Sequence, residues 1–245
     1  MRLLSYNIRF GGRRRRDLLA DVIGHLEPDV VILQEATEPD VVDWLAERTG
    51  LTSAVRRPDW SVAALSRVPL TVRAWHQPRP GRGFLELDSP ESPVRIFGVH
   101  LTAGLTARGE RIRVAEAQKL VAFLGTPVKP SVAVGDFNSI APGDRIVVAH
   151  WPLWIRLLLR VDGGVRTEAM RSLADSGLTD VFRRLHPDEP GYTLPARGPS
   201  VRLDYLLAAA QAVPLIRACS PVSAGDVPIV ARASDHLPLL SVIEP

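Results

Sequence analysis

Residues 131–139 read SVAVGDFNS, and this stretch decides the fold. Its first five residues are small or apolar, which is typical of a short strand that is buried on both faces. Asp136 and Asn138 follow this strand directly. The stretch therefore predicts a central strand with two polar side chains held at the edge of its sheet.

Short strands with helices between them are expected along the rest of the chain. Helices are expected over residues 17–26, 111–124 and 166–176. Strands are expected over residues 2–8, 29–33, 60–65, 69–75, 83–88, 94–101, 202–209, 213–218 and 237–243. This order predicts one mixed α/β domain, residues 1–245, with two packed sheets. Residues 139–164 stand out as an irregular insert.

The composition is that of a globular protein. The 245 residues are 46% hydrophobic and 23% charged, which excludes fibrous and wholly disordered chains. The single cysteine, Cys219, excludes an internal disulfide or a cysteine-rich zinc module. The N-terminal apolar run is too short for a signal peptide, and no apolar stretch is long enough to span a membrane. We therefore expect a soluble, cytoplasmic protein.

The charge balance is mild, but the kind of basic residue is informative. The net charge of +3 does not by itself argue for nucleic acid. Of the 30 basic residues, all but Lys119 and Lys129 are arginines, which suit bidentate contacts to phosphate. A genome rich in G and C would give the same excess. The oligomeric state cannot be inferred from the sequence.

Polar side chains recur where the predicted strands end. They are Asn7, Gln34, Glu35, His100, Asp136, Asn138, Asp204, Asp235 and His236. Strands that end on one rim bring such groups together and hold them rigidly. Carboxylate and amide oxygens suit Mg²⁺ or Mn²⁺ rather than zinc held by sulfur. A divalent ion beside histidines predicts metal-assisted hydrolysis of a phosphoester.

Six sequence blocks carry a resemblance to a known family. They are LSYNIR (4–9), VVILQE (30–35), GVHLT (98–102), AVGDFNS (133–139), RLDYLL (202–207) and SDHLPL (234–239). In this order they resemble the endonuclease/exonuclease/phosphatase superfamily. That superfamily includes DNase I-like nucleases, abasic-site endonucleases of the exonuclease III type, sphingomyelinases, inositol-polyphosphate phosphatases and deadenylases. The resemblance implies a four-layer α/β/β/α sandwich and in-line hydrolysis without a covalent enzyme intermediate.

The resemblance also implies a set of residues that would hold the metal. Glu35 would be the main ligand of Mg²⁺ or Mn²⁺. Asn7 would lie next to it, and Asp235 would assist at the same ion.

The same resemblance implies roles in the reaction itself. Asp136 would orient and deprotonate the attacking water, and Asn138 would hold that water or a phosphate oxygen. His236 would stabilise charge on the transition state, with Asp204 fixing its tautomer. His100 matches the DNase I-like, lipase-like and phosphatase-like branches, whereas abasic-site endonucleases of the exonuclease III type generally carry tyrosine there.

The sequence leaves the substrate open. His100, the modest charge and the apolar insert favour a small-molecule or lipid-headgroup phosphoester, either diester or monoester. The alternative is a DNA or RNA endo- or exonuclease of the DNase or DNA-repair type, with which the arginine excess agrees. A non-catalytic binding module would require decayed motifs, and the six blocks are intact.

Two further segments are candidates for substrate contact. Arg13, Arg14, Arg15 and Arg16 follow the first strand and are expected to hold substrate phosphates, or alternatively to form a solvated turn. Trp151 and Trp154 belong to the apolar stretch 151–159 of the insert. That stretch is expected either to contact a hydrophobic substrate or a membrane surface, or to pack on the sheet or against another copy of the chain.

Overall fold

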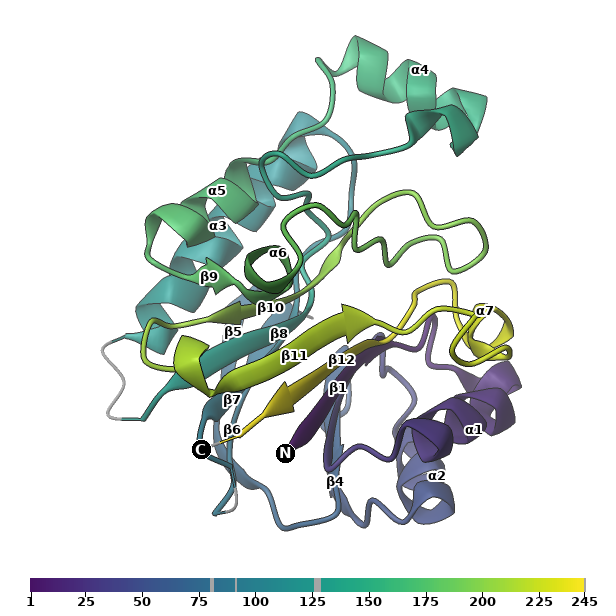
Figure 1. Ribbon diagram of the computed structural model, residues 1–245, viewed down its shortest axis with the longest axis vertical. Helices are drawn as coiled ribbons and strands as arrows, with labels where there is room; N and C mark the ends of the chain where they lie inside the picture. The colour runs from purple at the N-terminus through teal and green to yellow at the C-terminus, as the bar shows by residue number, and fades with distance from the viewer. Residues whose placement is uncertain (80–81, 91, 126–128, 245) are drawn as a thin grey trace.

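Two six-stranded sheets lie face to face in the computed structural model, which describes residues 1–79, 82–90, 92–125 and 129–244 (Figure 1). The first sheet has the order β11-β12-β1-β2-β4-β3. Its strands are β1 (Arg2–Asn7), β2 (Val30–Gln34), β3 (Ser53–Val55), β4 (Val62–Ser66), β11 (Ile216–Pro221) and β12 (Leu239–Ile243). The second sheet has the order β5-β6-β7-β8-β10-β9. Its strands are β5 (Thr71–Arg79), β6 (Arg82–Asp88), β7 (Arg95–His100), β8 (Ser131–Asp136), β9 (Thr179–Asp180) and β10 (Asp204–Ala208).

Helices cover the outer face of each sheet. The first sheet packs against α1 (Arg16–Leu26), α2 (Pro39–Thr49) and α7 (Val230–Ala233). The second packs against α3 (Ala107–Leu124) and α5 (Glu168–Asp175). The short α6 (Val181–Leu185) lies against β10 and β11, while α4 (Leu153–Val161) projects from one end of the molecule (Figure 1). The expected four-layer α/β/β/α sandwich is confirmed.

Alternating side chains divide the core into three apolar layers. In β2, Val30 and Ile32 point toward the second sheet, whereas Val31 and Leu33 point toward the helices of the first. This alternation follows from the two-residue repeat of a strand, and it lets a single apolar run serve two layers.

The structure corrects several expected boundaries. Residues 213–215 form a 3-10 turn, η3 (Val213–Leu215), and the strand begins only at Ile216. Helix α2 was not expected, although Pro39 at its first turn is a helix-start signal. The insert 139–164 is not wholly irregular, because it contains the 3-10 turn η2 (Val148–His150) and α4.

Candidate active site

Strand register aligns three of the predicted site residues. In the parallel pair β7–β8, His100 lies opposite Asp136. In the antiparallel pair β8–β10, Asp204 lies opposite the same residue. All three side chains are buried. Backbone pairing therefore brings two carboxyls and an imidazole to one edge of the second sheet.

Gly135 permits the close approach of these strands beside Asp136. Its φ is 149°, and a Cβ built on it would lie 1.9 Å from the carbonyl oxygen of Val99 in β7. Any side chain at this position would force β7 and β8 apart. The glycine before Asp136 is thus required by the packing of the site.

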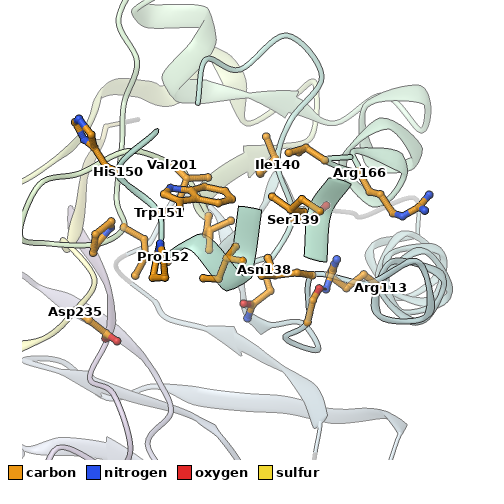
Figure 2. A pocket seen from close by; sticks show the side chains of 18 residues that line it. Arg113, Asn138, Ser139, Ile140, His150, Trp151, Pro152, Arg166, Val201 and Asp235 are labelled. Atoms are coloured by element: carbon orange, nitrogen blue, oxygen red, sulfur yellow. The ribbon is translucent and has the colours of Figure 1, made fainter. Parts of the chain in front are cut away.

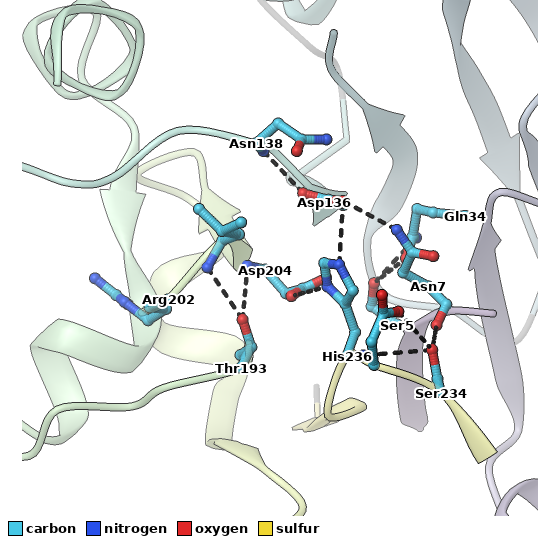
Figure 3. A network of polar contacts seen from close by, with 12 residues as sticks. Ser5, Asn7, Gln34, Asp136, Asn138, Thr193, Arg202, Asp204, Ser234 and His236 are labelled. Carbon is cyan, nitrogen blue, oxygen red and sulfur yellow. Dashed lines mark hydrogen bonds and ion pairs between the residues drawn. The ribbon is translucent and has the colours of Figure 1, made fainter. Parts of the chain in front are cut away.

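Asp136 is the centre of the polar network in Figure 3. Its Oδ2 accepts a hydrogen bond from Asn7 Nδ2 at 3.0 Å, and its Oδ1 accepts one from the backbone N of Asn138 at 2.8 Å. The Nε2 atoms of His100 and His236 each lie 3.9 Å from Oδ2. Burial raises the pKa of the Asp136 carboxyl, although His236 and His100 act in the opposite direction.

His236 and Asp204 form a buried pair behind Asp136 (Figure 3). Nδ1 of His236 lies 2.9 Å from Oδ2 of Asp204. Burial alone would lower the pKa of His236, but the charge and hydrogen bond of Asp204, followed by the charges of Asp136 and Asp235, raise it to about 10. The imidazole is therefore positively charged at neutral pH, with Nε2–H on the side of Asp136.

Asn7 connects the two sheets at the site. It ends β1 and donates through Nδ2 to Asp136 and, at 3.3 Å, to Oε1 of Glu35. Its Oδ1 accepts from the backbone N of Arg9 at 2.9 Å. Glu35 directly follows β2 and accepts from the backbone N of Phe10 at 2.6 Å. Carboxyls from both sheets are thus joined through one amide.

Asn138 and Asp235 lie at the margin of this group. Asn138 donates through Nδ2 to the carbonyl of Leu101 at 3.1 Å, which fixes its side chain beside β7. Asp235 is partly exposed and pairs with Nε of Arg9 at 3.2 Å. The structure therefore brings the predicted catalytic and metal-binding residues to one site.

The donor set fits a hard divalent ion. Ligand atoms of Asp136, Asp204 and His236 all lie within 4.8 Å of one another. Because the charged His236 ring has no free lone pair, only the carboxylate oxygens of this group can bind a cation. The predicted ligands Asn7, Glu35 and Asp235 are not part of this group. Among the described residues, Oδ1 of Asp204 is a buried carboxylate oxygen without a hydrogen-bond partner. Such an oxygen-rich group suits Mg²⁺ or Mn²⁺ better than a soft metal.

The four consecutive arginines differ in their surroundings. Arg13 pairs with Glu38 at 2.6 Å and with Asp40 at 2.8 Å, in the turn η1 (Arg13–Arg15). Arg16 lies over the ring of Trp44 at 4.7 Å. Arg15 donates to three backbone carbonyls, those of Ile8, Arg9 and Ala233. Arg14 is exposed. Three of the four therefore have protein partners, and phosphate binding by this run stays a prediction.

The two tryptophans of the insert have different environments. Trp151 is partly buried and donates through Nε1 to Ser200 Oγ at 2.8 Å. Trp154 is 65% exposed on α4, together with Leu153, Leu157 and Val161. The outer face of α4 is thus apolar and lies in solvent. Among the described residues, no helix is long and apolar enough to cross a membrane.

A pocket of about 500 Å³ opens beside the site. Asn138 and Asp235 belong to its lining, and Figure 2 shows Trp151 across its middle. Most of its other walls are apolar, and they come largely from the insert, α4 and residues 194–203: Ile140, Pro152, Ile155, Leu159, Val165, Leu194, Pro195, Val201 and Leu203. This pocket is an apolar recess in contact with the candidate site.

Sequence reasoning missed several residues that hold the site in place. Thr193 Oγ1 accepts from the backbone N of Asp204 at 3.2 Å, and Ser234 Oγ donates to the carbonyl of Asn7 at 2.6 Å. Arg202 is buried and pairs with Asp144 and Asp180 at 2.5–2.9 Å. Ser234 and Arg202 belong to the blocks SDHLPL and RLDYLL, so their positions in those blocks were the available signal.

Solved structures of other proteins share this architecture. An AP endonuclease from Archaeoglobus fulgidus is 19% identical with a TM-score of 0.76. The 3′ phosphatase NExo from Neisseria, bound to a product DNA hairpin, is 19% identical with a TM-score of 0.74. The 3′-5′ exonuclease NExo from Neisseria meningitidis is 20% identical with a TM-score of 0.72. In all three, both chains are covered over 100% of their length. No curated protein matches the chain significantly.

The shared class is the DNase I-like fold of two packed sheets. The chain belongs to the endonuclease/exonuclease/phosphatase family, whose model matches residues 4–236. It is accordingly a hydrolase that acts on phosphoester bonds.

Proposed function

We propose that this chain is a Mg²⁺-dependent nuclease that hydrolyses phosphoester bonds of DNA. The observation that carries the proposal is the alignment of Asp136 between His100 and the Asp204–His236 pair. The proposal prefers the nuclease alternative, whereas the sequence favoured a small-molecule or lipid-headgroup phosphoester.

The metal would be held by oxygen atoms at the strand ends of the first sheet. Glu35 would be its main ligand, and Asn7 and Asp235 would assist; Mn²⁺ would serve in place of Mg²⁺. When bound, a divalent ion neutralises charge on the phosphate and lowers the pKa of water.

Asp136 would act as the general base. Burial raises its pKa, which makes the carboxylate a stronger proton acceptor than an exposed aspartate. Hydrogen bonds from Asn7 and Asn138 hold both of its oxygens in place. The amide of Asn138 would contact the same water or a phosphate oxygen.

His236 would stabilise negative charge on the phosphate. Its Nε2–H lies 3.9 Å from Oδ2 of Asp136, too far for a hydrogen bond, so this donor is available to a phosphate oxygen. Asp204 keeps the ring oriented and charged. His100, on the other side of Asp136, would contact a second phosphate oxygen.

The choice of DNA is supported by what the similar structures act on. An AP endonuclease, a 3′ phosphatase bound to a DNA hairpin and a 3′-5′ exonuclease all share this fold. The arginine-rich composition agrees with a phosphate-rich polymer.

A substrate panel with matched variants tests the proposal. Duplex, single-stranded, abasic and 3′-phosphorylated DNA, RNA and bis-p-nitrophenyl phosphate are assayed with Mg²⁺ and with EDTA. We expect cleavage of DNA that EDTA abolishes, and a loss in kcat of about 1,000-fold or more for Asp136→Asn and His236→Ala. Asp175→Asn, the same chemical change on the exposed end of α5, should be neutral. Turnover in EDTA, or an active Asp136→Asn variant, would overturn the mechanism.

A second candidate is hydrolysis of a small or lipid-like phosphoester, and the apolar pocket favours it. Its volume of about 500 Å³ is that of a typical small-ligand site, and it opens beside Asn138 and Asp235. The exposed apolar face of α4 lies at the border of this pocket, and it would contact a membrane surface that supplies such a substrate. Sphingomyelin and inositol phosphates belong in the same panel, together with liposome flotation of the Trp154→Ser variant. Turnover of these compounds without DNA cleavage would favour this candidate.

A further inference from the structure

The loop after β1 carries an exposed aromatic ring at the edge of the candidate site. Phe10 is 79% exposed, and its backbone N donates to Oε2 of Glu35 at 2.6 Å. A single exposed apolar side chain is common on protein surfaces and proves nothing alone. Here, however, the ring is attached to the same hydrogen-bond network as the predicted metal ligand.

The backbone of this loop is in an unusual conformation. Arg9 and Phe10 have φ values of 52° and 49°, and Gly11 and Gly12 follow with 69° each. Only glycine adopts the left-handed region at little cost, so a phenylalanine there destabilises the fold. Phe10 gains no burial in exchange, because its ring lies in solvent. Strained residues of this kind are concentrated at functional sites.

The site itself holds the loop rigid from the inside. The backbone N of Arg9 donates to Oδ1 of Asn7 at 2.9 Å, and the backbone N of Gly11 donates to the carbonyl of Glu35 at 2.9 Å. Arg15 holds it from the outside through the carbonyls of Ile8 and Arg9. The backbone that carries the Phe10 ring is therefore held in place at the edge of the site before substrate binds.

A cation lies beside the ring. The guanidinium carbon of Arg9 is 5.7 Å from the centre of the Phe10 ring, and Arg9 Nε pairs with Asp235 at 3.2 Å. A flat apolar ring next to a basic group matches a nucleotide, which carries a flat base and an anionic phosphate. Aromatic side chains stack on bases of any sequence, since every base has a π-face.

We propose that Phe10 forms a base-stacking subsite for the nucleotide next to the scissile phosphate. This inference rests on the proposed nuclease function. It adds a substrate-positioning residue whose effect is on the base, whereas Asp136 and His236 act on the phosphate.

Steady-state kinetics on paired substrates test the stacking. Phe10→Ala and Phe10→Leu should lower kcat/KM on DNA about 10-fold, mainly through KM, and Phe10→Trp should restore it. Two further oligonucleotides each lack one of the two bases that flank the cleaved phosphate. On one of these two substrates, the loss of kcat/KM caused by Phe10→Ala should disappear. The matched control is Phe123→Leu on α3, the same change on another partly exposed ring. A Phe10→Ala penalty that is equal on all substrates, or absent, would overturn the subsite.

A binding measurement separates this proposal from the proposed function. Oligonucleotides with 2-aminopurine beside the target phosphate are titrated with the Asp136→Asn protein. Stacking should quench the 2-aminopurine fluorescence about twofold or more. In the double variant that combines Asp136→Asn with Phe10→Ala, this quenching should be absent. If the wild-type chain cleaves no nucleic acid, the proposed function fails, and the quenching still decides whether the subsite exists. No quenching by the protein with Phe10 intact would refute the subsite even in an active nuclease.

Discussion

Replacing Asp204 by asparagine would test the central physical claim about the site. The change keeps the size of the side chain but removes the charge 2.9 Å from Nδ1 of His236. The pKa of His236 is about 10, against an ordinary value of 6.5. At about 1.4 kcal/mol per unit, the surroundings favour the charged imidazole by about 5 kcal/mol.

Asp204 is the largest of the charged groups that raise this pKa. An opposite charge in contact shifts a pKa by about 1–3 units, so the pKa of His236 in the variant should fall to about 7–9. The asparagine can also turn its amino group toward Nδ1, which leaves that nitrogen unprotonated, so the ring keeps Nε2–H but loses its positive charge. We expect kcat on the best substrate to fall about 100- to 10,000-fold, with KM little changed.

The assay combines kinetics with a titration. Rates are measured between pH 6 and pH 10 with Mg²⁺, and NMR follows the His236 ring in the metal-free protein. The matched control is Glu86→Gln, because Glu86 pairs with His76 at 2.7 Å outside the site and its loss should leave kcat unchanged. A kcat within threefold of wild type, or an unchanged pKa of His236, would refute the reasoning.

Three other predictions concern stability and substrate contact. Gly135→Ala should destabilise the fold by about 3 kcal/mol or more in urea unfolding, because its Cβ would lie 1.9 Å from the Val99 carbonyl oxygen; an unchanged midpoint would contradict this. The raised pKa of His236 contributes stability that is fully present below about pH 6.5 and is lost as the pH rises through about 10. The free energy of unfolding in urea should therefore be a few kcal/mol higher at pH 6 than at pH 10 in the wild type, and this difference should be smaller in His236→Gln. An equal pH dependence of the two proteins would count against the assignment. Arg15→Gln should lower the free energy of unfolding by about 1–2 kcal/mol and lower kcat/KM, since Arg15 donates to three backbone carbonyls. Arg13→Gln should change neither quantity, because Arg13 pairs with exposed carboxylates. Equal effects of the two variants would exclude this assignment.

Local patterns in the sequence predicted most of the fold. The apolar runs around Val31 and Val134 identify buried strands because each of their side chains has to leave water on one face or the other. Helix α4 was missed because its apolar residues are not confined to one buried face: Leu159 is buried, while Leu153 and Trp154 are exposed. Periodicity predicts an element only where one face is covered and the other is not.

The candidate site, like the fold, was predicted from the sequence only in part. The order of the six blocks indicated which polar residues to examine, since polar groups that follow buried strands end at a shared edge. It did not indicate the hydrogen bond between Asn7 and Asp136, because these residues are 129 positions apart and their contact depends on how the two sheets pack. The sequence likewise did not predict the different surroundings of Arg13 and Arg15, because their partners come from distant segments.

By itself, the sequence determined the two-sheet class, the family and the polar residues of the strand ends, because these follow from local hydrophobic patterns and from short motifs in order. Only the tertiary structure decided that Asn7 joins Asp136 to Glu35, that an apolar pocket opens beside Asn138, and that Phe10 lies in solvent at the edge of the site. Burial and charge pairing depend on which distant segments come into contact, and that is a property of the folded chain rather than of any one segment.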